Sequence, residues 1–193
     1  MPRYMKLKYI HKILFVDLEL TCGFPEDEPE KSSRSEIIEI GIAEVDTKVL
    51  EITRTKSIIV RPVHSYITPF CEELTGHSQE SVDRGTNLGK AFKTLRKSFG
   101  STSKPWMAWG QDIVQIDEAC DIQNLPFPFS DYFTDLSAMY SQMCGDNSRT
   151  SLQGALKALG LEFDGRPHSG VDDAINTARI YLEIARRVRL QGP

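Results

Sequence analysis

Two carboxylates stand two residues apart at the end of a short apolar run. Asp17 and Glu19 follow residues 13–16, whose side chains favour a buried strand. In an extended chain, residues two apart point to the same side. Two carboxylates on one face repel each other and lose solvation, and a hard cation between them removes this penalty. The pattern predicts a divalent metal site, although an acidic strand end facing water has the same sequence.

A third carboxylate lies at the start of an amphipathic helix that we predict for residues 171–188. The apolar stripe of this helix comprises Val171, Ile175, Ala178, Leu182 and Ala185. At about 100° per residue, Asp172 falls in the polar sector with Asn176, whereas Asp173 falls on the opposite edge of the stripe and leans toward a cleft. A carboxylate that only complements the helix dipole would also occupy this first turn.

One histidine precedes this helix by a few residues. His168 follows Gly165-Arg166-Pro167, so the sequence places it on a loop. Because imidazole titrates near neutral pH, a histidine beside a metal carboxylate can act as general base on a water. An ordinary exposed loop histidine is the alternative interpretation.

The elements that carry these residues alternate in character along the chain. Strands are expected at residues 13–16, 37–45, 57–60, 105–109 and within 132–136. Helices are expected at 88–99 after Asn87, at 112–124, between Ser151 and Gly160, and at 171–188. Residues 23–35 are polar and carry two prolines, which indicates a loop. An antiparallel start followed by strand–helix alternation predicts an α/β fold, with a mixed five-stranded sheet and helices packed on its faces.

Composition limits the class of protein. The 193 residues suit one domain, and neither a signal peptide nor an apolar run long enough for a bilayer is expected. The four cysteines lack zinc-site spacing and suit a reducing cytoplasm. A net charge of −4 argues against coating nucleic acid by bulk positive charge. It is compatible with a cleft in which four carboxylates are neutralised by two divalent cations.

Several motifs together resemble a known family. Asp17-Leu18-Glu19, a middle Asp, and the run from His168 to Asp173 resemble the DEDDh branch of the DnaQ-like 3′→5′ exonucleases. Further stretches resemble the narrower branch of the 3′ histone-mRNA (enhanced-RNAi) and KapD-like exonucleases. These stretches are Glu36-Ile37-Ile38-Glu39-Ile40, Val60-Arg61-Pro62, residues 70–76 and residues 161–168. The likeness runs from about residue 13 to 185, so we expect one exonuclease domain over 1–193 with a core at about 12–188.

The resemblance implies an RNase-H-like fold with helices on both faces of the sheet and a mechanism using two Mg²⁺ or Mn²⁺ ions. Metal ligands would be Asp17, Glu19, Asp112 and Asp173, and His168 would deprotonate the attacking water. Nucleoside 5′-monophosphates would leave one at a time from a single-stranded 3′ end. Asp112 follows Trp109-Gly110 one residue sooner than in many relatives, so Asp117 is its alternative.

Substrate contacts are expected on the same basis. Leu20 and Thr21 follow the metal carboxylates, and Leu74-Thr75-Gly76 resembles a loop that presses on the terminal nucleotide. Trp109 could stack on a base or belong to the core. A basic helix face could follow phosphates or be solvated surface, and it comprises Lys90, Lys93, Arg96 and Lys97. RNA is the expected polymer, with single-stranded DNA and an inactive nucleic-acid-binding module as alternatives.

Overall fold

The computed structural model describes residues 11–25, 35–146 and 148–191. Its strands are β1 (Lys12–Leu20), β2 (Ile37–Asp46), β3 (Glu51–Ile59), β4 (Trp106–Ala108) and β5 (Phe133–Asp135). Its longer helices are α2 (Pro69–Thr75), α4 (Leu88–Thr94), α5 (Asp112–Gln123), α6 (Leu136–Cys144), α7 (Leu152–Leu159) and α8 (Gly170–Gln191). Short elements are α3 (Gln79–Asp83), the π-helical turn η1 (Leu95–Phe99) and the 3₁₀ turn η2 (Ser101–Ser103). Among the described residues, none of the helices combines the length and apolar character needed to traverse a bilayer.

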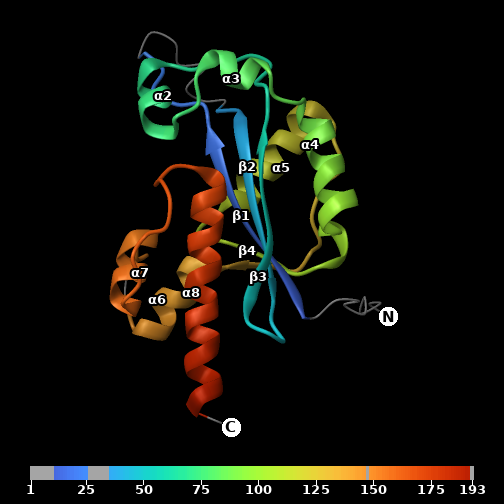
Figure 1. Cartoon of the computed structure of the whole chain (residues 1–193). Helices are drawn as coiled ribbons and strands as arrows, with labels where there is room; N and C mark the ends of the chain where they lie inside the picture. Colours follow the sequence, from blue (N-terminus) through green and yellow to red (C-terminus); the bar gives the residue numbers. More distant parts are fainter. Residues whose placement is uncertain (1–10, 26–34, 147, 192–193) are drawn as a thin grey trace.

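The five strands form one mixed sheet in the order β3-β2-β1-β4-β5. β1 pairs antiparallel with β2, and β2 pairs antiparallel with β3. β4 and β5 extend the sheet in parallel from the other side of β1. The carboxyl ends of β1, β4 and β5 therefore meet at one edge, where the sequence places its carboxylates. The expected mixed five-stranded sheet is confirmed (Figure 1).

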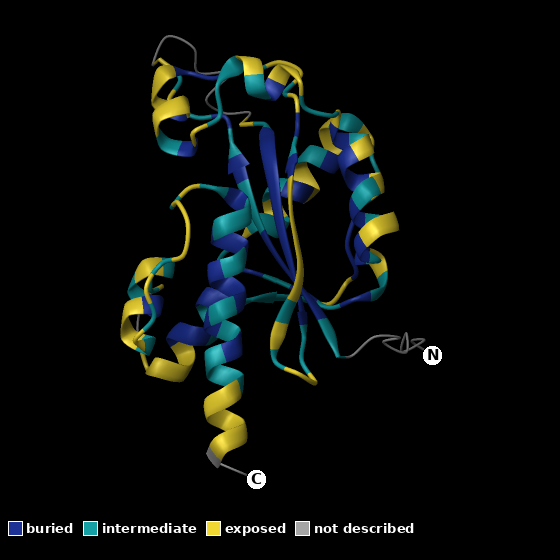
Figure 2. Cartoon of the chain, viewed as in Figure 1, coloured by how far each residue is buried: buried dark blue, intermediate teal, exposed yellow. Residues whose placement is uncertain are grey.

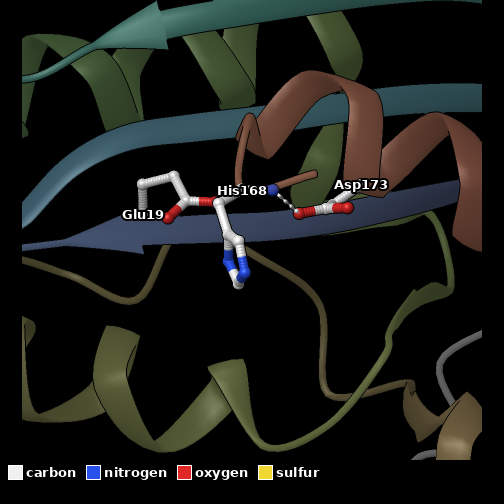
Figure 3. Close-up of side chains that lie close together, drawn as sticks. All are labelled: Glu19, His168 and Asp173. Carbon is white, nitrogen blue, oxygen red and sulfur yellow. Dashed lines mark hydrogen bonds between the residues drawn. The ribbon is translucent and has the colours of Figure 1, made fainter. Parts of the chain in front are cut away.

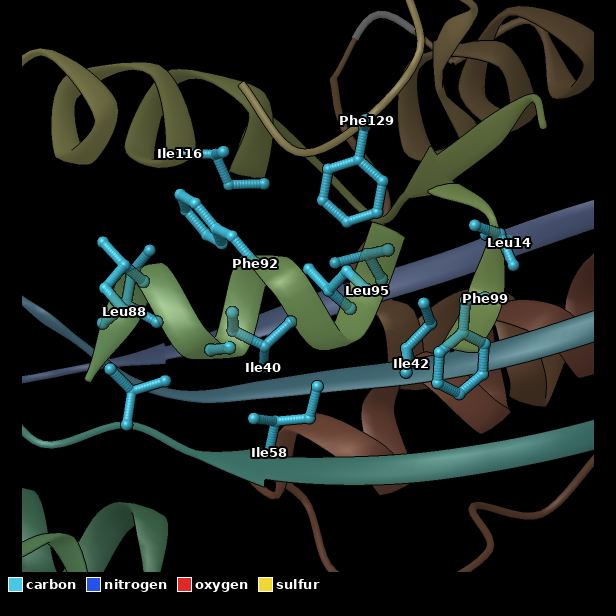
Figure 4. Close-up of a cluster of buried hydrophobic side chains, with 14 of the residues drawn as sticks. Leu14, Ile40, Ile42, Ile58, Leu88, Phe92, Leu95, Phe99, Ile116 and Phe129 are labelled. Carbon is cyan, nitrogen blue, oxygen red and sulfur yellow. The ribbon is translucent and has the colours of Figure 1, made fainter. Parts of the chain in front are cut away.

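Alternate residues of β1 enter two different cores, as the period of a strand requires. Ile13 and Phe15 pack with α6, α7 and α8 on one face. Leu14 and Val16 pack on the other face with α4 and α5, in the cluster around Phe92 (Figure 4). Helices cover both faces, which confirms the expected layers. By the same alternation, Asp17 and Glu19 share the face of Phe15, under α8.

The expected elements are present, with several boundaries moved and three helices added. β3 begins at Glu51, well before the expected residue 57, and its exposed residues mark the sheet edge (Figure 2). The π-helical turn η1 completes the helix expected at 88–99. The sequence did not predict α2, α3 or α6. Most of the expected loop at 23–35, and the segment 1–10 considered as a leader, lie outside the described residues.

Helices α2 and α3 lie beyond the carboxyl end of β1, next to the amino end of α8 (Figure 1). They pack through a small cluster around Cys71 and Val82, both fully buried, against Ile38 of β2. Thr68 and Ser78 cap their amino ends by accepting hydrogen bonds from backbone amides. Gly76 ends α2 in the left-handed conformation, which glycine adopts without strain. This layer therefore stands directly beside the edge of the sheet that carries the carboxylates.

Candidate active site

The site begins where β1 leaves the core. In the register with β2, Asp17 faces Gly41 and Glu19 faces Glu39. A side chain at Gly41 would place its Cβ 1.9 Å from the carbonyl carbon of Gly170, so only glycine lets α8 approach this closely. Glu19 is buried and Asp17 is half-buried. The strand thus presents both carboxylates on one face, as predicted from their spacing, and the first turn of α8 lies against that face.

The loop before α8 and its first turn bring the other two predicted residues to the same place. Asp173 lies in that turn, is buried, and accepts a hydrogen bond from the backbone N–H of His168 at 3.0 Å. His168 has φ of 60°, a conformation that L-residues rarely adopt. The strained backbone holds the His168 side chain beside Glu19 and Asp173 (Figure 3). Such strain is common at functional sites, where the surrounding structure maintains it.

Four of the five residues predicted to carry the chemistry line one cavity of about 410 Å³: Asp17, Glu19, His168 and Asp173. Ligand atoms of Glu19, His168 and Asp173 all lie within 4.8 Å of one another. Trp109, Phe163 and Pro167 supply apolar walls, and residues 151–153 at the start of α7 close another side. The arrangement combines carboxylates, one exposed imidazole and apolar walls, which suits hydrolysis of a bound ligand.

Asp112 opens α5, just after β4, and does not line this cavity. The backbone amides of Leu18 and of Asp112 itself lower the pKa of its carboxyl group, against the effect of burial, and its charge acts on Asp17. Asp117 is exposed further along α5 and is not among the charges that act on Asp17. The structure therefore brings Asp112, not Asp117, next to the first carboxylate.

Burial raises the pKa of each carboxylate in this group, and neighbouring negative charges raise it further. Burial, followed by the charge of Asp173, raises the pKa of Glu19 to about 8. Burial also raises the pKa values of Asp112 and Asp173 to about 6 each. For Asp17, burial and the charge of Asp112 raise the pKa well above its usual range. Burying several carboxylates side by side is unfavourable when they are ionised. A hard divalent cation prefers such oxygen ligands and would neutralise their charge.

These raised pKa values predict how the metal-free protein responds to pH. Unfolded carboxylates lose their protons near pH 4, whereas the folded cluster keeps protons up to about pH 8. Between these pH values the folded state binds more protons, so its stability falls as pH rises. We expect the melting temperature in EDTA to fall from pH 5 to 8.5, and Mn²⁺ to reverse the loss. A flat profile in EDTA over this range would contradict the shared burial of these groups.

The predicted substrate contacts lie in different surroundings. Trp109 lines the cavity, and its indole N–H donates to the carbonyl of Thr150 at 3.2 Å. Leu20 packs against the core at the end of β1, and Thr21 is fully buried with its hydroxyl accepting from the amide of Glu36. Leu74-Thr75-Gly76 is the last turn and cap of α2, where the sequence predicted a loop. Thr75 is buried, so Leu74 and Gly76 are the more accessible members.

Three charged residues beside the site were not singled out from the sequence. Glu39 bonds to the first amides of α8. Asp135 at the end of β5 pairs with Arg149 at 2.8 Å and lies near Asp112. Arg166 donates to the carbonyls of Glu73 and Leu74. The carboxyl ends of parallel strands meet at one edge of a sheet. Knowing that β1, β4 and β5 are parallel could therefore have indicated that Asp135 lies beside the site.

Comparison with known protein families decides the classification. The family model described as exonuclease, RNase_T, matches residues 14–181. The chain belongs to this exonuclease family. The match spans every element from β1 into α8, including all five residues predicted to carry the chemistry. The carboxylate-lined cavity therefore lies wholly within the part of the chain that the family shares.

Two relatives illustrate the relationship. Human ERI1 exoribonuclease 3 is 32% identical over 188 residues, which cover 92% of this chain and 54% of the human protein. The probable 3′-5′ exonuclease KapD of Bacillus subtilis is 28% identical over 174 residues, covering 89% and 83% of the two chains. The chain thus spans about half the length of the human relative. Within the described residues, Glu19, His168 and Asp173 form a group that could hold a metal ion.

A solved structure shares the whole architecture. The nuclease domain of 3′hExo, a DEDDh family member bound to rAMP, superposes with a TM-score of 0.81 at 29% identity. The superposition covers 93% of this chain and 94% of that domain. The RNase-H-like fold expected from the resemblance is therefore confirmed.

Proposed function

We propose that this exonuclease removes nucleoside 5′-monophosphates one at a time from single-stranded 3′ ends, chiefly of RNA. The observation that carries the proposal is the convergence of Asp17, Glu19, His168 and Asp173 on one cavity. Three carboxylates and an imidazole in one cleft can bind cations, activate a water and act on a phosphodiester. The proposal treats residues 1–193 as a single exonuclease domain.

Support for RNA comes from the relatives. The similar human protein is named an exoribonuclease, and the similar nuclease domain was solved with rAMP bound. The same cavity could accept a DNA 3′ end, because the two polymers differ at the 2′-hydroxyl. The free thiols of all four cysteines further support a reducing setting such as the cytoplasm.

Each site residue has a distinct part in the proposed reaction. Asp17, Glu19 and Asp173 would hold two Mg²⁺ or Mn²⁺ ions, and Asp112 would support the site from beside Asp17. When bound, the ions stabilise the charge on the entering and leaving oxygens at phosphorus. His168 would take the proton of the attacking water at its imidazole, which is exposed to the cleft.

The walls of the cavity would hold the terminal nucleotide. Trp109 and Phe163 offer aromatic faces, on which a base stacks without regard to its identity. Ser151 and Gln153 offer hydrogen-bonding groups on the α7 side of the same cavity. Leu20, Thr21 and the end of α2, Leu74–Gly76, remain proposed contacts around the opening.

The middle carboxylate gives a paired prediction. We expect Asp112→Asn to lower kcat by about 10²-fold, because residues that support metal ligands typically contribute 10–100-fold. Asp117→Asn should keep wild-type activity, since Asp117 is exposed on α5. The activity of both variants is measured as the rate at which a 5′-labelled RNA oligomer is shortened in Mn²⁺. Full activity of Asp112→Asn, or a comparable loss in Asp117→Asn, would contradict the assignment.

The polymer preference is tested with matched 5′-labelled RNA and DNA oligomers, each with Mn²⁺, Mg²⁺ or EDTA. The proposal predicts a ladder that shortens from the 3′ end, absent in EDTA, and faster on RNA. Faster shortening of DNA would assign the deoxyribonuclease alternative. No cleavage of either polymer by folded protein with metal present would favour an inactive nucleic-acid-binding module.

A further inference from the structure

A buried carboxylate beside the site has no part in the chemistry described above. Glu39 lies on β2 opposite Glu19 and is 1% exposed. It accepts hydrogen bonds from the backbone amides of Gly170 at 2.9 Å and Val171 at 3.3 Å. The Nε2 atom of His77 lies 2.8 Å from the same carboxylate. A carboxylate without cation or donors is rarely buried so completely, so these bonds account for its position.

The bonds to Glu39 fix the beginning of α8. Gly170 and Val171 carry two of the amides that a helix leaves unpaired at its amino end, and Glu39 accepts from both. Gly41, two residues along β2, brings the strand against the Gly170 backbone. Asp173 lies three residues after Gly170, and His168 two residues before it. A single carboxylate therefore sets the place of the short segment that carries both site residues.

His77 extends this connection to α2. It directly follows Gly76, the cap of α2, and is held to Glu39 across the gap between the helix and the sheet. Because a carboxylate can only accept, Nε2 must carry the hydrogen. On the other side, Arg166 donates to the carbonyls of Glu73 and Leu74, linking the end of α2 to the loop before His168. The end of α2 is thus linked on two sides to the segment that carries His168 and Asp173.

We propose that Glu39 is a positioning residue that holds His168 and Asp173 in their working arrangement, and that His77 couples the end of α2 to it. This inference rests on the proposed exonuclease function. When a 3′ end contacts Leu74 and Gly76, the contact would be transmitted through His77 and Glu39 to the first turn of α8. Neither Glu39 nor His77 touches the reacting atoms.

The Glu39 test compares Glu39→Gln with a matched control on the same strand. The amide of Gln can accept from only one of the two α8 amides, and its NH₂ group faces the other. We expect kcat on RNA and the affinity for Mn²⁺ without RNA each to fall about 10–100-fold, with KM within about twofold. Glu44 is also buried, but it lies on the opposite face of β2 and pairs with Arg54 and Lys104. Glu44→Gln should lower the melting temperature and leave kcat and Mn²⁺ affinity unchanged.

The His77 test separates coupling from general stability. His77→Ala should raise KM for RNA about fivefold, the effect of one lost hydrogen bond. His77→Gln keeps a donor near the place of Nε2 and should restore most of the loss. A KM that rises equally in both variants would contradict the coupling.

Different results would contradict the positioning role of Glu39 and the proposed exonuclease function. Wild-type kcat and Mn²⁺ affinity in Glu39→Gln, or an equal loss in Glu44→Gln, would overturn the positioning role. If Glu39→Gln does not fold, the His77→Ala variant tests the positioning role instead. Wild-type kcat, KM and Mn²⁺ affinity in His77→Ala would then overturn that role. If the wild-type protein cleaves neither RNA nor DNA, the proposed function fails. The Mn²⁺ affinities of Glu39→Gln and Glu44→Gln then still decide whether Glu39 positions the site.

Discussion

Asp17→Asn should lower kcat by at least about 10³-fold, because the several kcal/mol that metal coordination contributes correspond to that factor. The same substitution should raise the melting temperature of the metal-free protein. Burial and the charges of Asp112 and Asp173 raise the pKa of Asp17 well above its usual range, so its ionised form destabilises the fold. Asparagine has nearly the same shape and carries no charge. Loss of activity together with a gain in stability distinguishes a functional carboxylate from a structural one.

The Asp17 variant has a control at the other end of the sheet. Asp46 ends β2 and pairs with Lys12 at 3.0 Å, far along the strand from the cavity. Asp46→Asn should keep wild-type kcat and leave the melting temperature unchanged or slightly lower. Thermal unfolding in EDTA and in Mn²⁺, with rates on labelled RNA, measures both variants. Substantial activity in Asp17→Asn, or a lower melting temperature in EDTA, would contradict the account of this site.

His168→Asn should lower kcat by about 10²–10⁴-fold, the usual contribution of a general base. Asparagine is the appropriate replacement because His168 has φ of 60°, and asparagine tolerates this conformation better than alanine. The backbone N–H of residue 168 can then still donate to Asp173. Any loss of activity can thus be attributed to the imidazole rather than to a rearranged loop.

Binding of Mn²⁺ distinguishes the two parts that His168 could take. A ring nitrogen of His168 lies within 4.8 Å of carboxylate oxygens of Glu19 and Asp173, so one bound ion could contact all three residues. A general base predicts that His168→Asn binds Mn²⁺ nearly as well as the wild type, while a ligand predicts a parallel loss of affinity and rate. His64→Asn, which changes an exposed histidine outside the cavity, is the control and should behave as wild type.

The strand period made the centre of the site predictable. Because side chains alternate along β1, the sequence placed Asp17 and Glu19 on one face, and the structure places that face under α8. The helix N-caps were also predictable from the sequence, and the side chains of Asn87 and Ser151 accept hydrogen bonds from backbone amides as expected. Such local rules depend on a few neighbouring residues, so they can be applied before the fold is known.

The helical period was misleading on the other side of α8. Asn176 was assigned to the polar sector of the helix, but it is fully buried. Its side chain bonds with the backbone of Asp164 in the preceding loop, and Arg179 donates to it at 2.6 Å. A periodicity argument considers only the helix and the sheet. It cannot foresee that the chain before the helix folds back over its polar side.

Contacts between segments that are distant along the chain could not be predicted from the sequence either. Glu39 and Gly170 are 131 residues apart, and their bond exists only because β2 and α8 meet. The end of α2 was expected to be a loop, although Thr68 and Gly76 cap a helix there. A helix of seven residues shows too little periodicity to be recognised. The residues proposed to position the site are therefore the ones that only the structure reveals.

The first product released from RNA identifies the reaction that this site performs. An RNA oligomer labelled at the phosphate between its last two nucleotides is incubated with the protein and Mn²⁺. We expect the first labelled product to be a nucleoside 5′-monophosphate, and we expect EDTA or Asp17→Asn to prevent its release. Labelled internal fragments, a nucleoside 3′-monophosphate, or release that persists in EDTA would contradict the proposed reaction.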